Sequence, residues 1–233
     1  MASDLLVFER SARDSGFTRI AGVDEAGRGP LAGPVVSAAV ILPEGFRSDD
    51  VTDSKALSEK KRAALLQLIY QQATAIGIGI VDAVEIDRVN ILQASLLSMA
   101  FAVANLTPAP DYLLIDGIFR VPCTVDQEAI AKGDARSLSI AAASIVAKVT
   151  RDRLMARYHE EFPEFGFDRH KGYPTAAHKA AIRTHGPCPI HRRTFRGVRE
   201  VLGFGPVFDA SADGRKTTPE TSNHGVTEDT EIL

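Results

Sequence analysis

The stretch Gly22-Val-Asp-Glu-Ala-Gly-Arg-Gly-Pro-Leu-Ala-Gly-Pro34 decides how the whole chain is interpreted. Two adjacent acids, Asp24 and Glu25, end a short apolar run, and a glycine-rich segment follows at once. Carboxylates repel phosphate unless a divalent cation lies between them, whereas glycine lets backbone N–H groups approach a ligand closely. The stretch therefore predicts a metal site beside a polyanion. Taken alone, it is equally compatible with a turn that Asp24 caps and in which the glycines serve geometry only.

The stretch joins two expected strands, 18–25 and 34–42, which are rich in Ile, Val and Ala and should form an antiparallel pair. Outside this hairpin, strands and helices alternate. Further strands are expected at 75–81, 111–115 and 121–125, and helices after a Ser58 cap and at 83–106, 137–162 and 175–184. In the helix expected at 137–162, small residues should permit close packing on a sheet. This order predicts an α/β domain with a mixed central sheet flanked by helices.

The amino-acid composition changes twice towards the C-terminus. From residue 163, aromatic, Gly, Pro, His and Arg residues alternate around one expected helix, and beyond residue 203 Ser, Thr, Asp, Glu and Gly dominate. We expect a main domain over 1–162, a small C-terminal helical appendage over 163–203 and a disordered acidic tail over 204–233.

The composition of the chain indicates the class of protein and the compartment in which it is expected. With 233 residues, 45% of them hydrophobic and 24% charged, the chain suits a globular domain with a substantial core. Charged residues interrupt the first seventeen positions, so no signal peptide is expected, and every apolar run is far shorter than the ~20 residues of a membrane span. Cys123 and Cys188 form no disulfide framework. We expect a cytoplasmic monomer without membrane contact.

The formal net charge of −3 hides a basic region. Between residues 132 and 199 there are fourteen Lys and Arg against six Asp and Glu, a local net charge of +8. Solvated helix faces are the ordinary fate of such residues, so this region supports a nucleic-acid partner without establishing one.

Four acids stand at the ends of expected elements: Asp24, Glu25, Asp116 and Asp134. Ligands collect at strand ends in α/β sheets, so distant segments can converge there. Clustered carboxylates can hold two ions ~3.5–4 Å apart that promote phosphoryl displacement, and oxygen ligands suit Mg²⁺ or Mn²⁺. Consecutive strand residues point to opposite faces, so Asp24 and Glu25 can share a site only if the strand breaks there. The glycines that follow favour such a break.

Several blocks resemble, in order, those of bacterial ribonuclease HII. They are Gly22 to Val35, Asp53-Ser-Lys-Ala-Leu-Ser58, Leu114-Ile-Asp-Gly117, Lys132-Gly-Asp134, Ala142 to Asp152 and His170-Lys-Gly-Tyr-Pro-Thr175. The resemblance covers roughly residues 18–203 and implies the ribonuclease H-like fold. It also implies an endonuclease that hydrolyses the RNA strand of RNA–DNA hybrids and cuts at single ribonucleotides in duplex DNA. Its products would carry 5′-phosphate and 3′-hydroxyl ends.

The resemblance also assigns roles to residues. Asp24, Glu25, Asp116 and Asp134 are similar to the metal-binding catalytic acids of the family. The backbone of Gly27-Arg28-Gly29 would read the ribose 2′-hydroxyl, and Tyr173 would pack on the following sugar. Phosphate contacts would come from Ser54 and Lys55, helped by Lys171, while Asp152 is a secondary candidate near the metals. Thr52 stands where the family pattern has Asn, and the acidic tail lies outside that pattern.

The same residues also bear on other possible functions. A non-catalytic binder of hybrids has no need of four carboxylates, which cost affinity for a polyanion, so the enzyme is favoured. A DNA-directed nuclease on the same fold stays open. Residues 27–33 have glycine spacing one residue too long for a dinucleotide fingerprint. His185, Cys188 and His191 have a spacing that could suggest zinc, but a fourth ligand is not evident and prolines mark a rigid loop.

Overall fold

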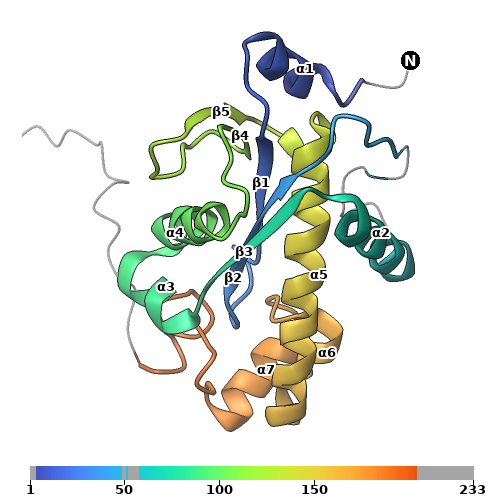
Figure 1. Ribbon diagram of the computed structural model, residues 1–233. Coiled ribbons are helices and arrows are strands. Elements are labelled where there is room, and N and C mark those ends of the chain that lie inside the picture. Colours follow the sequence, from blue (N-terminus) through green and yellow to red (C-terminus); the bar gives the residue numbers. More distant parts are fainter. Residues whose placement is uncertain (1–3, 49–50, 52–57, 204–233) are drawn as a thin grey trace, which may run out of the picture.

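The computed structural model describes residues 4–48, 51 and 58–203, and it contains a five-stranded sheet of order β3-β2-β1-β4-β5 (Figure 1). The strands are β1 (Ile20–Ala26), β2 (Val35–Ile41), β3 (Ala75–Val81), β4 (Tyr112–Asp116) and β5 (Asp126–Ile130). β2 pairs antiparallel with β1 and β3, whereas β4 pairs parallel with β1 and β5. The predicted mixed sheet and the predicted hairpin are confirmed.

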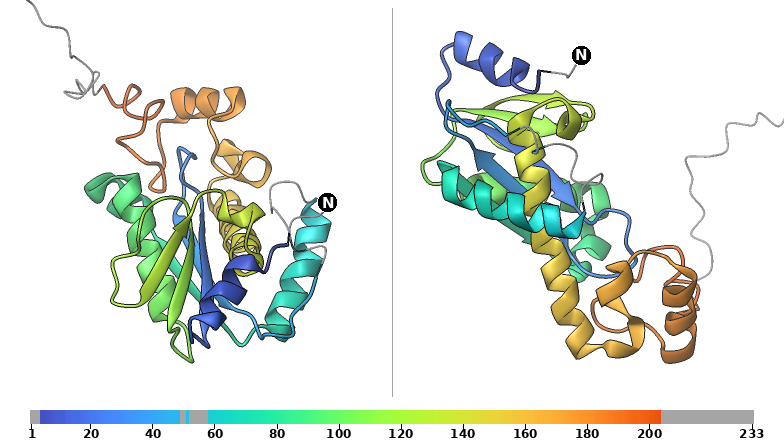
Figure 2. Two further views of the ribbon diagram at one scale, coloured as in Figure 1. Left: turned by 90° about the horizontal axis from the view of Figure 1, so that it is seen from above. Right: turned by 90° about the vertical axis from the view of Figure 1, so that its right-hand side faces the viewer.

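Helices cover both faces of this sheet (Figures 1 and 2). The helices are α1 (Val7–Asp14), α2 (Glu59–Gln72), α3 (Ala83–Val89), α4 (Ile91–Ala104), α5 (Leu138–Glu161), α6 (Phe167–His170) and α7 (Ala176–His185), with 3-10 turns η1 (Gly133–Ala135) and η2 (Pro163–Phe165). One apolar core lies between the sheet and the pair α2 and α5, and a second lies between the sheet and α4.

Small residues let α5 lie directly on β1, as the sequence predicts. All residues from Leu138 to Ala147 are buried. A Cβ atom added at Gly22 would come within 2.0 Å of the Ser139 carbonyl carbon, so no side chain fits between the strand and the helix. This contact lies just before the acids at the end of β1, and it sets the distance between them and the next turns of α5.

The fifth strand is not the one expected. Residues 121–125 form no strand; β5 is instead 126–130, a sheet-edge strand of mostly polar residues. Val121 is buried in the preceding loop, where the Gln127 side chain bonds both its N–H and its carbonyl oxygen. The apolar character of 121–125 therefore reflects a buried loop rather than a paired strand.

Two further differences from the expected structure concern helices. The single helix expected at 83–106 is divided at Asn90, which has a φ of 70° and whose side chain caps α4 by accepting from Leu92 and Gln93. Helix α1 was not expected, because its charges resemble a solvated lead-in. Its Glu9 is buried and accepts hydrogen bonds from Ser137 and Ser139, which fastens α1 to the start of α5.

The segment after α5 forms a small helical unit beside the far end of that helix (Figure 2, right). Here η2, α6 and α7 enclose a separate apolar cluster around Phe165 and Phe167 that reaches back to Leu31 of the glycine-rich stretch. The expectation for residues 204–233 lies outside the described residues.

Candidate active site

Asp24 and Asp116 occupy neighbouring positions on parallel strands. The last paired residues of β1 and β4 are Val23 and Ile115, so these acids come next on the two strands. Residues in register on parallel strands point to the same face. Asp24 is only 4% exposed and hydrogen-bonds the Ser144 side chain of α5. The structure thus brings two of the four predicted acids to one edge of the sheet.

The expected strand break at Asp24 and Glu25 is wrong, because β1 continues through Ala26 in unbroken pairing with β2. Glu25 nevertheless lines the same hollow as Asp24 and also a second hollow on the α4 side. The last pair between β1 and β4 is Val23 with Ile115, and β4 itself ends one residue later, at Asp116. Beside Glu25 there is therefore no β4 residue to separate the two faces of the sheet. The end of a neighbouring strand, rather than a break in β1, lets adjacent acids share a site.

These acids perturb one another. Burial raises the pKa of Asp24 well above its ordinary value, and the nearby charges of Glu25 and Asp116 raise it further. Burial also raises the pKa of Glu25, which the Arg28 guanidinium, 3.3 Å from Glu25 Oε1, partly opposes. Carboxylates gathered in this way repel one another, and a divalent cation between them would relieve that repulsion.

Asp134 lies close to Asp116 because the preceding residue, Gly133, contacts the Asp116 side chain. The Gly133 N–H donates to Asp116 Oδ1 at 2.6 Å, and Asp134 follows it in η1. Asp134 is 6% exposed, but it is not among the residues lining the hollow that holds the other three acids. The structure therefore places the fourth predicted acid in the segment that contacts Asp116.

One hollow of about 500 Å³ gathers most of the predicted site. The predicted residues that line it are Asp24, Glu25, Gly27, Arg28, Gly29, Asp116 and Tyr173. Four polar or charged side chains that line it were missed from the sequence: Arg62 of α2 and Ser144, Lys148 and Arg151 of α5. The last three are spaced by four and three residues, which places them on one helix face, and this periodicity was a usable signal.

Two buried arginines hold the glycine-rich segment. Arg151 and Arg192 are 1% and 0% exposed, and their guanidinium groups donate to backbone carbonyls. The carbonyls in this segment are those of Gly27, Arg28, Ala32, Gly33 and Pro34. Among the hydrogen bonds of the described residues, none uses the N–H groups of Arg28 or Gly29. Those two donors are therefore available to a ligand.

Gly27 cannot carry a side chain here. Its φ is +104°, and an added Cβ would lie 2.1 Å from Arg151 Nε and 2.8 Å from the Pro34 carbonyl oxygen. The left-handed conformation and the close guanidinium each require glycine. Arg151 and Gly27 are therefore matched parts of the same turn.

Tyr173 lies in the loop between α6 and α7 and faces the glycine segment. A Cβ atom added at Gly29 would be 3.6 Å from Tyr173 Cε1, and the tyrosine is 44% exposed. Lys171 is close in sequence, but its ammonium group donates to the Asp168 carbonyl and it does not line the hollow. The predicted sugar-contacting tyrosine thus stands opposite the predicted sugar-reading glycine.

The remaining predicted residues are placed elsewhere. Asp152 accepts a hydrogen bond from Lys148 at 2.8 Å and does not line the hollow. Ser54 and Lys55 lie outside the described residues. Of the residues that could suggest zinc, Cys188 and His191 contact each other, with Sγ 3.1 Å from Nδ1, whereas the His185 ring lies edge-on to Phe165.

The donor chemistry of the acids fits a hard divalent cation, because all of the candidate ligands are carboxylate oxygens. As they stand, no group of three or more His, Cys, Asp or Glu side chains in the described part of the chain is arranged to hold a metal ion. An ion at Asp24, Glu25 and Asp116 therefore requires these side chains to turn towards it.

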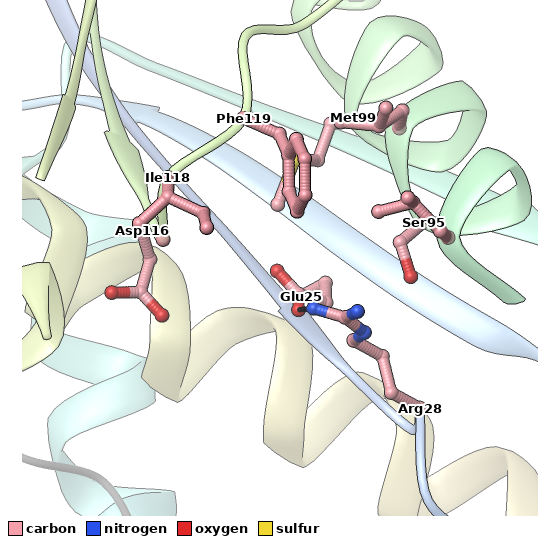
Figure 3. A pocket seen from close by; sticks show the side chains of 10 residues that line it. Glu25, Arg28, Ser95, Met99, Asp116, Ile118 and Phe119 are labelled. Atoms are coloured by element: carbon pink, nitrogen blue, oxygen red, sulfur yellow. Dashed lines mark hydrogen bonds and ion pairs between the residues drawn. The ribbon is translucent and has the colours of Figure 1, made fainter. Parts of the chain in front are cut away.

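A second hollow of about 250 Å³ adjoins the first. Figure 3 shows Glu25 and Arg28 on one side of it, with Met99 and Phe119 across from them. Glu25, Arg28 and Asp116 line it together with apolar residues from α4 and the loop after β4. The carboxylates therefore stand between a polar hollow and an apolar one.

Comparison with known proteins places the chain in a family. The profile described as Ribonuclease HII matches residues 21–198. The chain belongs to the ribonuclease HII family. It is 59% identical to the ribonuclease HII of Geobacter metallireducens over 84% of this chain and 92% of that protein. The same enzyme of Geobacter sulfurreducens is 60% identical over 84% of this chain and 90% of that protein.

A solved structure agrees with this assignment. The ribonuclease H2 from Pyrococcus horikoshii OT3 is 27% identical, with a TM-score of 0.69 over 80% of this chain and 98% of that chain. The resemblance stated from the sequence is confirmed, as are the fold and the placement of the chain among the ribonucleases H, which are hydrolases.

Proposed function

We propose that this protein is an endonuclease that hydrolyses the RNA strand of RNA–DNA hybrids and cuts at single ribonucleotides embedded in duplex DNA. One observation carries the proposal: the carboxylates of Asp24, Glu25 and Asp116 line the same hollow as Gly27, Gly29 and Tyr173. Groups suited to phosphodiester hydrolysis and groups suited to sensing a ribose therefore face one ligand. The products would carry 5′-phosphate and 3′-hydroxyl ends.

The acids would hold the catalytic ions. Asp24, Glu25, Asp116 and Asp134 would together bind two Mg²⁺ or Mn²⁺ ions, with Asp134 joining through its position beside the Asp116 contact. Such ions supply activation of the attacking water and neutralisation of the charge on the leaving oxygen. Until they bind, Ser144 and the Glu25 N–H hold the Asp24 carboxylate in place through hydrogen bonds.

Cationic side chains from two helices would position the phosphates. Arg62 of α2 and Lys148 of α5 both line the hollow, on the face of the sheet that α5 covers. Arg28 lies at its rim, where it restrains Glu25. Cations of this kind orient a nucleic-acid backbone without reading its sequence. Ser54, Lys55 and Lys171 are proposed as further phosphate contacts.

The glycine segment would recognise the sugar. The unused N–H groups of Arg28 and Gly29 can donate to a ribose 2′-oxygen, and that hydroxyl is the group that distinguishes RNA from DNA at a nucleotide. The exposed ring of Tyr173 offers an apolar face to the next sugar. In this arrangement the ribose determines which phosphate comes to the carboxylates.

The organisation of the chain forms part of the proposal. Residues 1–162 would be the catalytic domain and 163–203 a substrate-binding appendage that contributes Tyr173. A cytoplasmic monomer is proposed. In the described part of the chain, no helix is both long enough and apolar enough to span a bilayer.

The test compares three labelled duplexes in Mg²⁺ or Mn²⁺: one with a single embedded ribonucleotide, an RNA–DNA hybrid and an all-DNA control. Cleavage of the first two, with ends that a 5′-phosphate-dependent ligase accepts, supports the proposal. Equal cleavage of the all-DNA duplex would indicate a DNA-directed nuclease. Binding of the hybrid without cleavage in either ion would indicate a non-catalytic binder.

A further inference from the structure

Within the C-terminal unit, two buried histidines connect the backbone of Cys188 to that of Tyr173 by hydrogen bonds of fixed direction. The Cys188 N–H donates to His191 Nδ1 at 3.0 Å, so a neutral His191 carries its proton on Nε2. That nitrogen is 3.0 Å from His178 Nε2, which must therefore accept. His178 then carries its proton on Nδ1 and donates it to the Tyr173 carbonyl oxygen, 2.9 Å away.

The surroundings of the pair keep both rings neutral, as this chain of bonds requires. His178 and His191 are 0% and 2% exposed. Burial lowers the pKa of each ring to about 4, and a charge on His178 would lower the pKa of His191 further. His170 stacks on His178 with ring centroids 4.4 Å apart, which fixes the plane of that ring. The tautomers are thus determined by the contacts.

The residue after His191 holds the opposite wall of the hollow. Arg192 donates to the carbonyls of Gly27, Arg28 and Gly33, and its own N–H donates to the Leu31 carbonyl. Ala32 and His191 also form a β-bridge. Two consecutive residues therefore control both walls: His191 acts on Tyr173 through His178, and Arg192 acts on the glycine segment directly.

We propose that His178, His191 and Arg192 are positioning residues that fix the spacing between the Tyr173 ring and Gly29, and with it the gap in which the ribose is read. None of these three described residues lines the hollow, so they act through the residues that do. The inference rests on the proposed function, because it assigns them to the ribose-reading site. It also accounts for the Cys188 and His191 spacing without a metal, since both His191 ring nitrogens are engaged.

The test is a double-mutant cycle on the full chain. His178→Phe keeps the ring volume but removes the donor to Tyr173, whereas His178→Asn keeps a donor near the Nδ1 position. With a duplex containing one ribonucleotide, His178→Phe should lower kcat about 10-fold with KM little changed, and His178→Asn should recover part of that loss. Because His178 acts through Tyr173, the variant carrying both His178→Phe and Tyr173→Ala should lose no more than Tyr173→Ala alone.

The possible results distinguish failure of the proposed function from failure of the positioning role alone. If Tyr173→Ala cuts as well as the unaltered protein, the proposed role of Tyr173 fails and the inference fails with it. If Tyr173→Ala is impaired but His178→Phe is not, or if the two losses multiply, the inference alone is overturned.

A measurement on the unaltered protein makes the test independent of how the variants fold. Nitrogen NMR near pH 7 should show the imidazole proton on Nδ1 of His178 and on Nε2 of His191. The opposite tautomer on either ring would overturn the proposed chain of bonds.

Discussion

Replacing Asp24 by Asn should abolish cleavage and, in the absence of ions, stabilise the fold. Asp24 is buried beside Glu25 and Asp116, and these surroundings raise its pKa. A carboxyl group whose pKa is raised by folding contributes stability below its unfolded pKa and loses that contribution as pH rises through its folded pKa. At neutral pH, well above the unfolded pKa of an aspartate, burial of Asp24 among other acids therefore costs stability. Asn removes the charge and can still accept from the Glu25 N–H.

The size of the effect follows from what the substitution changes. It alters one charge in a well-packed position and leaves the shape nearly constant, so a gain of about 1–2 kcal/mol in the free energy of unfolding is expected. For a chain of this size that corresponds to a rise in Tm of roughly 2–8 °C. Loss of a carboxylate that is proposed to hold catalytic ions should lower kcat by about 10³-fold or more, because bound ions contribute several kcal/mol to the transition state.

The assay is thermal unfolding in EDTA between pH 5 and 8, followed by titration with Mg²⁺ and by the cleavage assay. The advantage of the Asn variant should grow as pH rises. Ions at ten times their Kd should stabilise the unaltered protein by about 1.4 kcal/mol and the variant by much less. Asp126→Asn, at an exposed position on β5, is the matched control and should change neither property. A variant that melts earlier than the unaltered protein in EDTA, or that still cuts, would refute the reasoning.

Substitutions at three further positions test other parts of the site. Gly29→Ala should be tolerated, because its Cβ would lie 3.6 Å from the Tyr173 ring. Gly29→Leu should reduce cleavage at a single ribonucleotide but leave the affinity for an all-DNA duplex unchanged, and equal losses on both measurements would contradict the sugar-reading role. Gly27→Ala should lower the free energy of unfolding by roughly 1–3 kcal/mol in urea titrations, because of its positive φ and the clash with Arg151, and an unchanged midpoint would contradict that account. Lys148→Ala should weaken hybrid binding and reduce the slope of log affinity against log salt by about 1; an unchanged slope would remove Lys148 from the phosphate contacts.

The sequence predicted the parts of the fold that leave a local pattern. The hairpin around the glycine-rich stretch and the close packing of α5 followed from apolar strands and small residues, and both were found. β5 was misplaced because an edge strand needs few apolar residues, while the buried loop before it has many. The division at Asn90 depends on a left-handed residue that a continuous apolar periodicity conceals.

The acids of the site could be predicted from the sequence, but the residues that position the site could not. Acids at strand ends could be recognised as a group, and their placement in one hollow required only sheet topology for Asp24 and Asp116. Arg192 and His178 could not be recognised in this way. Their partners are backbone carbonyls of distant segments, and a carbonyl carries no residue identity that a sequence pattern could reveal.

The missing side chain at Gly22 has a consequence for how variants of this enzyme should be interpreted. Gly22 touches neither hollow, yet the helix that supplies Ser144 and Lys148 rests directly on its backbone. Any larger residue there must push α5 outward and carry those two side chains away from Asp24. A change at this position would be classified as a core packing defect, but its first measurable symptom should be slower turnover in a protein that still folds.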